Sequence, residues 1–200
     1  AAIPENLVES SLFGYEKGAF TGALKTTKGV FQEADTGSLL LDEVTEIPTS
    51  MQAKLLRVLQ EKSVTKVGSY ESQNIDVRII STSNRNVLKM VEDKDFREDL
   101  FYRLNVFPIE IPSLRERMED LPLLVDHFLT KFSSKYNVEK KVMSSIALDK
   151  LYNHAWPGNV RELVNVIERS FLYANANNTI SEKNITLESN SSASIKMQSS

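Results

Sequence analysis

The chain contains 200 residues, of which 41% are hydrophobic and 26% are charged. These proportions are those of ordinary globular domains, so they exclude a disordered chain, a collagen-like chain and a disulfide-stapled miniprotein. The net charge of −3 provides no bulk attraction to nucleic acid or to an anionic membrane. No apolar run approaches the roughly 18 residues of a membrane span. The absence of cysteine excludes disulfides and thiolate metal sites, and is typical of a cytoplasmic protein.

The first half of the chain predicts strands that alternate with helices. Residues 38–42 are a short apolar run ending in an acid, typical of a strand buried on both faces of a parallel sheet. A helix is expected from Thr49, with Gln52 at capping-box spacing from it. Residues 75–82 and 106–112 predict two further strands. Strands separated by helices predict an α/β sheet, in which ligands bind at the carboxyl ends of the strands.

The second half of the chain predicts only helices. Asp120 can cap a helix whose apolar residues recur at helical spacing as far as Phe132. A shorter helix is expected around 146–153, and a last one from Asn159, with Glu162 in a capping-box-like position. We therefore predict part of an α/β subdomain over 1–112, a helical subdomain over 113–180, and a serine-rich linker or tail over 181–200.

Polar residues follow two of the predicted strands. Asp42 and Glu43 come directly after the first, and Ser83 and Asn84 after the second. A carboxylate at a strand end is well placed to hold Mg²⁺ on a nucleotide, and a neighbouring Glu can orient or deprotonate a water. The alternative is two solvated acids, or acids that cap the next helix. Taken alone, an apolar strand that ends in Asp and Glu favours the first interpretation, but it is not specific to it.

Arginines occur in two helical segments. Arg97 and Arg103 lie in a predicted helix whose apolar face holds Phe96, Leu100 and Leu104, and neither arginine belongs to that face. They either pair with nearby acids on the surface or reach a phosphate of a neighbouring molecule. Similarly, Arg161 lies in the first turn of a helix, where the helix dipole disfavours a cation unless an anion is near.

Two glycines flank an aromatic and a hydroxyl residue in the hexapeptide Gly18-Ala19-Phe20-Thr21-Gly22-Ala23. The glycines free the backbone of the loop. Phe20, at its tip, is either tucked under the domain or offered to a partner. Glycines at this spacing usually indicate only a turn, but the complete hexapeptide is far more specific.

In this order, the four clusters resemble the central AAA+ domain of bacterial enhancer-binding proteins, the sigma-54-dependent transcription activators. The resemblance extends from residue 1 to about residue 180. Its most specific part is LFGYEKGAFTGA, which contains the hexapeptide. GSLLLDE is similar to the Walker B motif of that family, FREDLFYRLNVFPI to its arginine-finger segment, and WPGNVREL to its sensor II motif.

The resemblance implies an α/β fold, an AAA+ parallel sheet of the P-loop NTPase type followed by a helical lid. It also implies an ATPase that assembles into a ring, usually a hexamer, and uses ATP and Mg²⁺. Asp42 would hold Mg²⁺, and Glu43 would activate the hydrolytic water. Asn84, together with Ser83, would sense the state of the γ-phosphate.

The remaining clusters would act on neighbouring molecules or from the lid. Arg97 and Arg103 would act on the ATP of the adjacent subunit, and Arg161 would contact the nucleotide from the lid. The glycine-flanked loop would touch sigma-54 through Phe20 and Thr21, so that ATP hydrolysis remodels RNA polymerase at the promoter. Contact with enhancer DNA would need a module outside these residues.

The chain departs from this family in one respect that affects catalysis. No G-x-x-x-x-G-K-[ST] phosphate loop occurs in it, and it begins at Ala1 without an initiator Met. We therefore expect a fragment that hydrolyses little or no ATP by itself. A non-catalytic sigma-54-binding or assembly module is the alternative, and a phosphate-loop motif in the coding sequence upstream of Ala1 would decide against it. A different AAA+ machine is a third possibility, which the hexapeptide disfavours.

Overall fold

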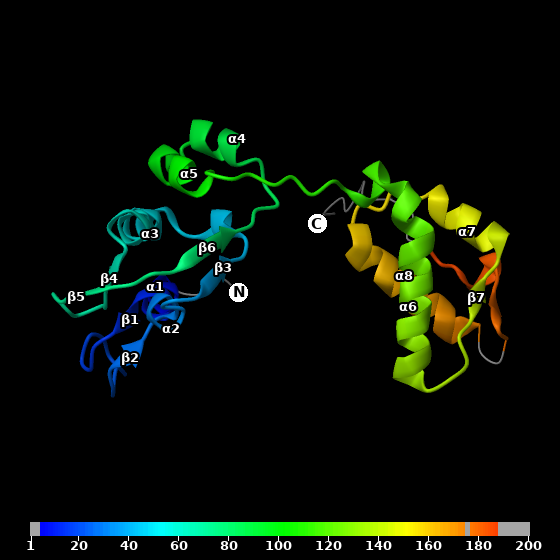
Figure 1. Cartoon of the computed structure of the whole chain (residues 1–200), viewed down its shortest axis with the longest axis horizontal. Helices are drawn as coiled ribbons and strands as arrows, with labels where there is room; N and C mark the ends of the chain where they lie inside the picture. Colours follow the sequence, from blue (N-terminus) through cyan, green and yellow to red (C-terminus); the bar gives the residue numbers. More distant parts are fainter. Residues whose placement is uncertain (1–4, 175–176, 188–200) are drawn as a thin grey trace, which may run out of the picture. The chain divides into compact units, whose positions relative to one another are not determined.

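The computed structural model describes residues 5–174 and 177–187, and the chain divides into two compact units, residues 1–109 and 110–200. Figure 1 shows the elements of each unit. No helix in the described ranges is long and apolar enough to cross a membrane.

The first unit is an α/β unit. Its helices are α1 (Glu5–Phe13), α2 (Val30–Glu33), η1 (Val44–Glu46), α3 (Thr49–Glu61), α4 (Val87–Glu92) and α5 (Glu98–Leu104). Its strands are β1 (Gly14–Tyr15), β2 (Thr27–Lys28), β3 (Ser38–Leu41), β4 (Ser63–Thr65), β5 (Ser72–Asn74) and β6 (Arg78–Ser81). The strands form three pairs: β3 with β6 in parallel, and β1 with β2 and β4 with β5 antiparallel.

The core of this unit lies where the apolar face of α3 meets α5 and the β3–β6 pair. Leu55 and Leu100 are completely buried there, and Phe96 is nearly so. The spacing of Phe96, Leu100 and Leu104 predicted the apolar face that packs here, but not its partners. Helix α5, however, begins at Glu98 and not at Phe96, because Arg97 has an extended backbone (φ −74°, ψ 132°) and serves as the N-cap.

Gln52 has a different partner from the one its sequence spacing suggests. The N-cap of α3 is Pro48, so the predicted capping box of Thr49 and Gln52 is wrong. Instead, the fully buried amide of Gln52 donates to the carbonyls of Ile47 (3.1 Å) and Asp95 (3.2 Å) and accepts from the backbone N–H of Arg97 (2.9 Å). A buried amide is held by whichever backbone groups lack partners. Here it ties the start of α5 to α3.

The strand expected over 106–112 is absent. The apolar side chains of this segment are exposed, Phe107 by 86% and Ile111 by 80%, and its backbone forms no ladder with any described residue. A strand is stable only beside another strand that takes up its N–H and C=O groups. The β-branched composition of 106–112 therefore indicates strand propensity, but no strand in the described residues pairs with it.

The second unit is helical. It contains η2 (Leu114–Glu116), η3 (Met118–Asp120), α6 (Leu121–Tyr136), β7 (Val142–Met143), α7 (Ser145–Tyr152), α8 (Asn159–Tyr173), β8 (Thr179–Ile180) and η4 (Glu182–Asn184). Helices α6 and α8 pack along each other around a core that includes Trp156 and Phe171. Ile185 is also buried in this core. The helical unit thus continues past residue 180, where we expected it to end, because an apolar side chain after η4 packs back onto it. The serine-rich residues 188–200 lie outside the described ranges.

One charged cluster joins α6 to α8. Lys135 Nζ and the Tyr136 hydroxyl both donate to Glu168 Oε1, at 2.6 and 2.7 Å. The bond from Lys135, followed by that from Tyr136, lowers the pKa of the Glu168 carboxyl. This cluster stabilises the folded helical unit only while Glu168 is ionised.

We predict that Glu168→Gln lowers the melting temperature of the helical unit by a few degrees at pH 7. Because the folded pKa lies below the unfolded value of about 4.3, the stabilisation is complete above that pH and is lost as the pH falls through the folded pKa. The gap between wild type and variant should therefore close in acid. The fluorescence of Trp156, the single tryptophan, reports this unfolding. Asp126→Asn, which breaks the exposed pair with Lys140, should leave the acid dependence unchanged, and a gap that is independent of pH would contradict the prediction.

Candidate functional site at the ends of two parallel strands

Three of the predicted site residues meet at the carboxyl ends of β3 and β6. The two strands pair in parallel with Leu41 opposite Ser81, so that Asp42 and Glu43 leave one strand beside the residues that follow the other. Asn84 Nδ2 donates to Glu43 Oε1 at 3.3 Å. Glu43 has a left-handed backbone (φ 50°, ψ 52°), which turns the chain sharply into η1. Asp42, Glu43 and Asn84 thus form one exposed polar group.

The hydroxyl nearest to the acids belongs to Thr82, which sequence reasoning overlooked. Thr82 Oγ1 donates to Asp42 Oδ1 at 2.6 Å and accepts from the N–H of Glu43 at 3.0 Å. Ser83, which we predicted beside Asn84, instead has its Oγ 3.2 Å from Thr45 Oγ1 and accepts from the N–H of Arg85 at 3.1 Å. The sequence signal was a hydroxyl residue at the end of the predicted strand 75–82, but only the register of β3 against β6 sets it beside Asp42.

The oxygen donors at this strand end fit a hard cation that keeps other ligands. Asp42 Oδ2 makes no hydrogen bond within the described part of the chain. No cluster of three or more His, Asp and Glu side chains gathers among the described residues to enclose a metal ion. Mg²⁺ is usually bound by one or two carboxylates together with water and phosphate oxygens. The Asp42 carboxylate fits that role and does not fit a dedicated metal cage.

The two candidate arginines lie on α5 and have partners of their own. Arg97 forms a bidentate pair with Asp99, at 3.0 Å from Nε and 2.7 Å from Nη2. This pair lowers the pKa of the Asp99 carboxyl. Arg103 donates twice to the carbonyl of Leu59, near the end of α3. In the described ranges, no hydrogen bond or ion pair joins either arginine to Asp42 or Glu43.

The glycine-flanked loop is the end of the β1–β2 hairpin. Gly18 and Gly22 have positive φ angles of 85° and 100°. A residue with a side chain is strained in this conformation, so the turn requires glycine at both positions. The N–H of Gly18 donates to the carbonyl of Ala23 at 2.9 Å and closes the loop. Phe20 is half-buried, with its ring centroid 5.0 Å from that of Tyr15, and Thr21 is exposed.

The base of this loop is held from both sides. Thr26 Oγ1 and Lys66 Nζ donate to the Glu16 carboxylate, at 2.5 and 2.9 Å, and these bonds lower the pKa of Glu16. Gly14 and Gly29 approach so closely that a Cβ on Gly29 would lie 2.3 Å from the nitrogen of Gly14. The hairpin therefore leaves the core at a fixed place.

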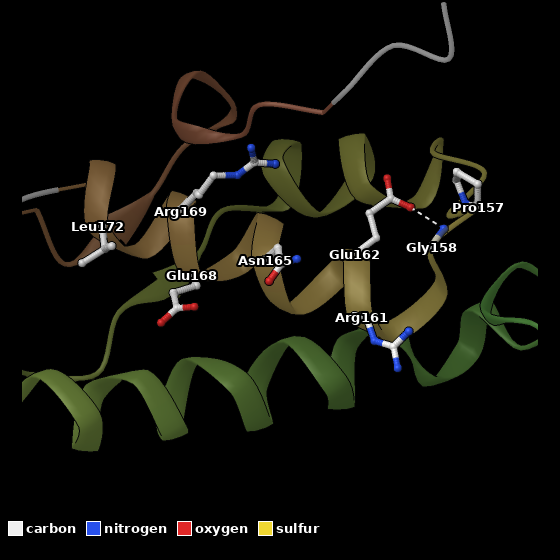
Figure 2. Close-up of a pocket in the computed structure, with 8 residues that line it drawn as sticks. All are labelled: Pro157, Gly158, Arg161, Glu162, Asn165, Glu168, Arg169 and Leu172. Carbon is white, nitrogen blue, oxygen red and sulfur yellow. Dashed lines mark hydrogen bonds between the residues drawn. The ribbon is translucent and has the colours of Figure 1, made fainter. Parts of the chain in front are cut away.

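Arg161 lies in the second unit, in the first turn of α8. It lines an open hollow of about 720 Å³ together with Glu162, Asn165 and Arg169. Figure 2 shows the Glu162 carboxylate turned back toward Gly158, whose N–H donates to it at 2.8 Å. The Arg161 side chain points away from this bond. Gly158 is thus the N-cap, and Asn159, which we expected there, accepts from the N–H of Leu114. No ion pair or hydrogen bond to Arg161 occurs among the described residues.

An α/β unit with acids at the ends of adjacent parallel strands, followed by a separate helical unit, is the organisation of the AAA+ fold. Comparison with known proteins agrees with this assignment. Residues 1–110 match the sigma-54 interaction domain, and residues 115–200 match the AAA+ ATPase lid domain. The chain therefore belongs to the sigma-54 interaction domain family, with the lid domain following it, as the motifs predicted.

Individual relatives support the same conclusion. The chain is 54% identical over 172 residues to the nitrogen fixation protein AnfA of Azotobacter vinelandii, covering 86% of this chain and 32% of AnfA. It is 51% identical over 177 residues to the DNA-binding transcriptional activator HyfR of Escherichia coli, covering 88% of this chain and 26% of HyfR.

Among solved structures, NtrX of Brucella abortus in complex with ADP superposes with a TM-score of 0.84 at 34% identity. The alignment covers 92% of this chain and 41% of NtrX. The same protein was also solved in complex with ATP, and superposes with a TM-score of 0.83. The chain spans about a third of the length of the curated relatives that it matches.

Proposed function

We propose that these residues are the greater part of the ATPase core of a sigma-54-dependent transcription activator. The observation that carries the proposal is the convergence of Asp42, Glu43 and Asn84 at the carboxyl ends of β3 and β6. The glycine-flanked loop held on its hairpin, the family membership and the nucleotide complexes of NtrX support it.

In this proposal each group at the strand end has one task. Asp42 binds Mg²⁺ through its free oxygen, and the bound Mg²⁺ neutralises phosphate charge. Glu43 orients and deprotonates the attacking water. Asn84 holds the Glu43 carboxylate through the 3.3 Å hydrogen bond from its Nδ2 to Glu43 Oε1, and so couples the position of that carboxylate to β6. Ser83, through Thr45, fixes the turn that carries Asn84.

The other predicted residues act on a neighbouring molecule or, in the case of Arg161, from the lid. Arg97 and Arg103 reach the nucleotide of an adjacent subunit in a ring, where a guanidinium stabilises the charge of the transferring phosphoryl group. Arg161 contacts the nucleotide from the lid. The loop of Gly18 to Ala23 touches sigma-54 with Phe20 and Thr21, and the energy of ATP hydrolysis moves this loop.

We expect Thr21→Ala in the full-length protein to abolish sigma-54 binding and to leave ATP hydrolysis within twofold of wild type. Thr21 is exposed at the loop tip, and its side chain contributes no bond to the fold of the described residues. Binding is measured by gel shift of labelled sigma-54 with the ATPase trapped by a transition-state analogue. Thr65→Ala, at an exposed position on β4, is the matched control.

Two outcomes would contradict the proposal. Unchanged sigma-54 binding by Thr21→Ala would favour a different AAA+ machine. Sigma-54 binding by a full-length protein without ATP hydrolysis would favour the non-catalytic binding module.

A further inference from the structure

Thr82 holds four consecutive residues at the end of β3. Its N–H donates to the carbonyl of Leu41 at 3.0 Å, and its carbonyl accepts from the N–H of Val44 at 2.9 Å. Its hydroxyl spans the two residues between them, as donor to Asp42 and acceptor from the N–H of Glu43. Any residue except proline could form the two backbone bonds, but the other two need a side-chain atom that both donates and accepts, as a hydroxyl does.

The direction of these bonds follows from the groups involved. The N–H of Glu43 can only donate, so Thr82 Oγ1 accepts there and has its own proton left for Asp42 Oδ1. A hydrogen bond that ends on a carboxylate is shorter and stronger than one between neutral groups, in keeping with the 2.6 Å separation. Thr82 thus occupies one oxygen of Asp42 and leaves Oδ2 open.

The second bond supports a strained residue. Glu43 is one of seven described non-glycine residues with positive φ, a conformation that is strained for a side chain and persists only when its surroundings enforce it. The bond from its N–H to Thr82 Oγ1 enforces it directly. The left-handed backbone of Glu43 places its carboxylate beside Asn84.

We propose that Thr82 is a positioning residue for the acidic pair. Its hydroxyl occupies one oxygen of the Asp42 carboxylate and leaves Oδ2, which would bind the cation, and it keeps Glu43 in the conformation that presents its carboxylate to water. This inference rests on the proposed ATPase function. The neighbouring hydroxyl of Ser83 cannot replace it, because that hydroxyl is already engaged by Thr45 and Arg85.

Thr82→Val and Thr82→Ser in the full-length protein test this role. Valine keeps the β-branched shape and both backbone bonds, but it removes both hydroxyl bonds, whereas serine keeps the hydroxyl. We expect the valine variant to need about tenfold more Mg²⁺ for half-maximal binding of a fluorescent ATP analogue, the change that loss of one bond to a charged group implies. Its affinity for the analogue in EDTA should not change, and serine should restore the Mg²⁺ dependence. Thr65→Val, the same change at an exposed threonine on β4, is the matched control.

A second measurement does not depend on nucleotide. Hydrogen exchange of the Glu43 amide should be faster in Thr82→Val than in wild type, and should return toward wild type in Thr82→Ser. A valine variant with wild-type Mg²⁺ dependence would overturn the positioning role alone. If wild type itself shows no Mg²⁺-dependent nucleotide binding, the proposed function fails, and the role of Thr82 in it fails too.

Discussion

Replacement of Glu43 by glutamine in the full-length protein is expected to lower the rate of ATP hydrolysis by about 10²–10⁴-fold, the range attributed to a positioned general base. The amide keeps the size and the contact with Asn84, but it cannot take a proton from water. Because Asp42 is unchanged, we expect the affinity for ATP with Mg²⁺ to stay within about threefold of wild type. Hydrolysis is followed as phosphate release, and binding with a fluorescent ATP analogue.

Glu46→Gln is the matched control for this prediction. Glu46 lies only three residues further along and forms an exposed pair with Arg85 at 2.8 Å. If proximity to the strand end were sufficient, both variants would lose activity. Loss of activity in both, or in neither, would contradict the role proposed for Glu43. Loss of nucleotide binding in Glu43→Gln would show that the residue acts on the ligand and not on water.

The sequence predicted elements well where one segment contains the whole signal. Helices α3, α6, α7 and α8 occur where apolar residues recur at helical spacing, and the run at 38–41 is a strand beside β6. It failed where the outcome depended on a distant partner. The segment over 106–112 has strand composition without a strand beside it, and Gln52 bonds to Asp95 and Arg97 across 43 and 45 residues of sequence. Local patterns contain no information on such partners.

The candidate site shows the same limit. That Asp42 and Asn84 come after the carboxyl ends of two strands followed from the order of apolar and polar residues. The contribution of Thr82 did not, because it depends on the register of β3 against β6, which sets Leu41 opposite Ser81. A shift of one residue would have turned the side chain of Thr82 to the other face of the sheet. Register is fixed by packing of the whole unit and cannot be read from either strand alone.

Arg97→Ala in the full-length protein is expected to lower ATP hydrolysis by about 10³–10⁵-fold, as loss of an arginine finger does. Two features of this residue suit a finger. Its backbone is fixed, because its N–H donates to the buried amide of Gln52. Within the described residues its guanidinium is bound only to exposed Asp99, and exposed ion pairs are weak, so the side chain can leave for a phosphate at little cost.

Mixing two inactive variants shows where Arg97 acts. In a ring, Arg97→Ala subunits keep Glu43, and Glu43→Gln subunits keep Arg97. If Arg97 acts on the neighbour, a site is complete wherever an Arg97→Ala subunit supplies Glu43 and the adjacent Glu43→Gln subunit supplies Arg97. In an equal mixture about a quarter of the interfaces have this order, so mixing should restore up to about a quarter of wild-type hydrolysis. If Arg97 acts within its own subunit, no mixed ring has a complete site, and activity should stay at the level of the single variants. Arg57→Ala changes an exposed arginine on α3 and should hydrolyse ATP at the wild-type rate. Mixed with either inactive variant, it should give only the activity expected from its own share of the subunits. Recovery on mixing would place catalysis at the subunit interface, so that hydrolysis depends on assembly.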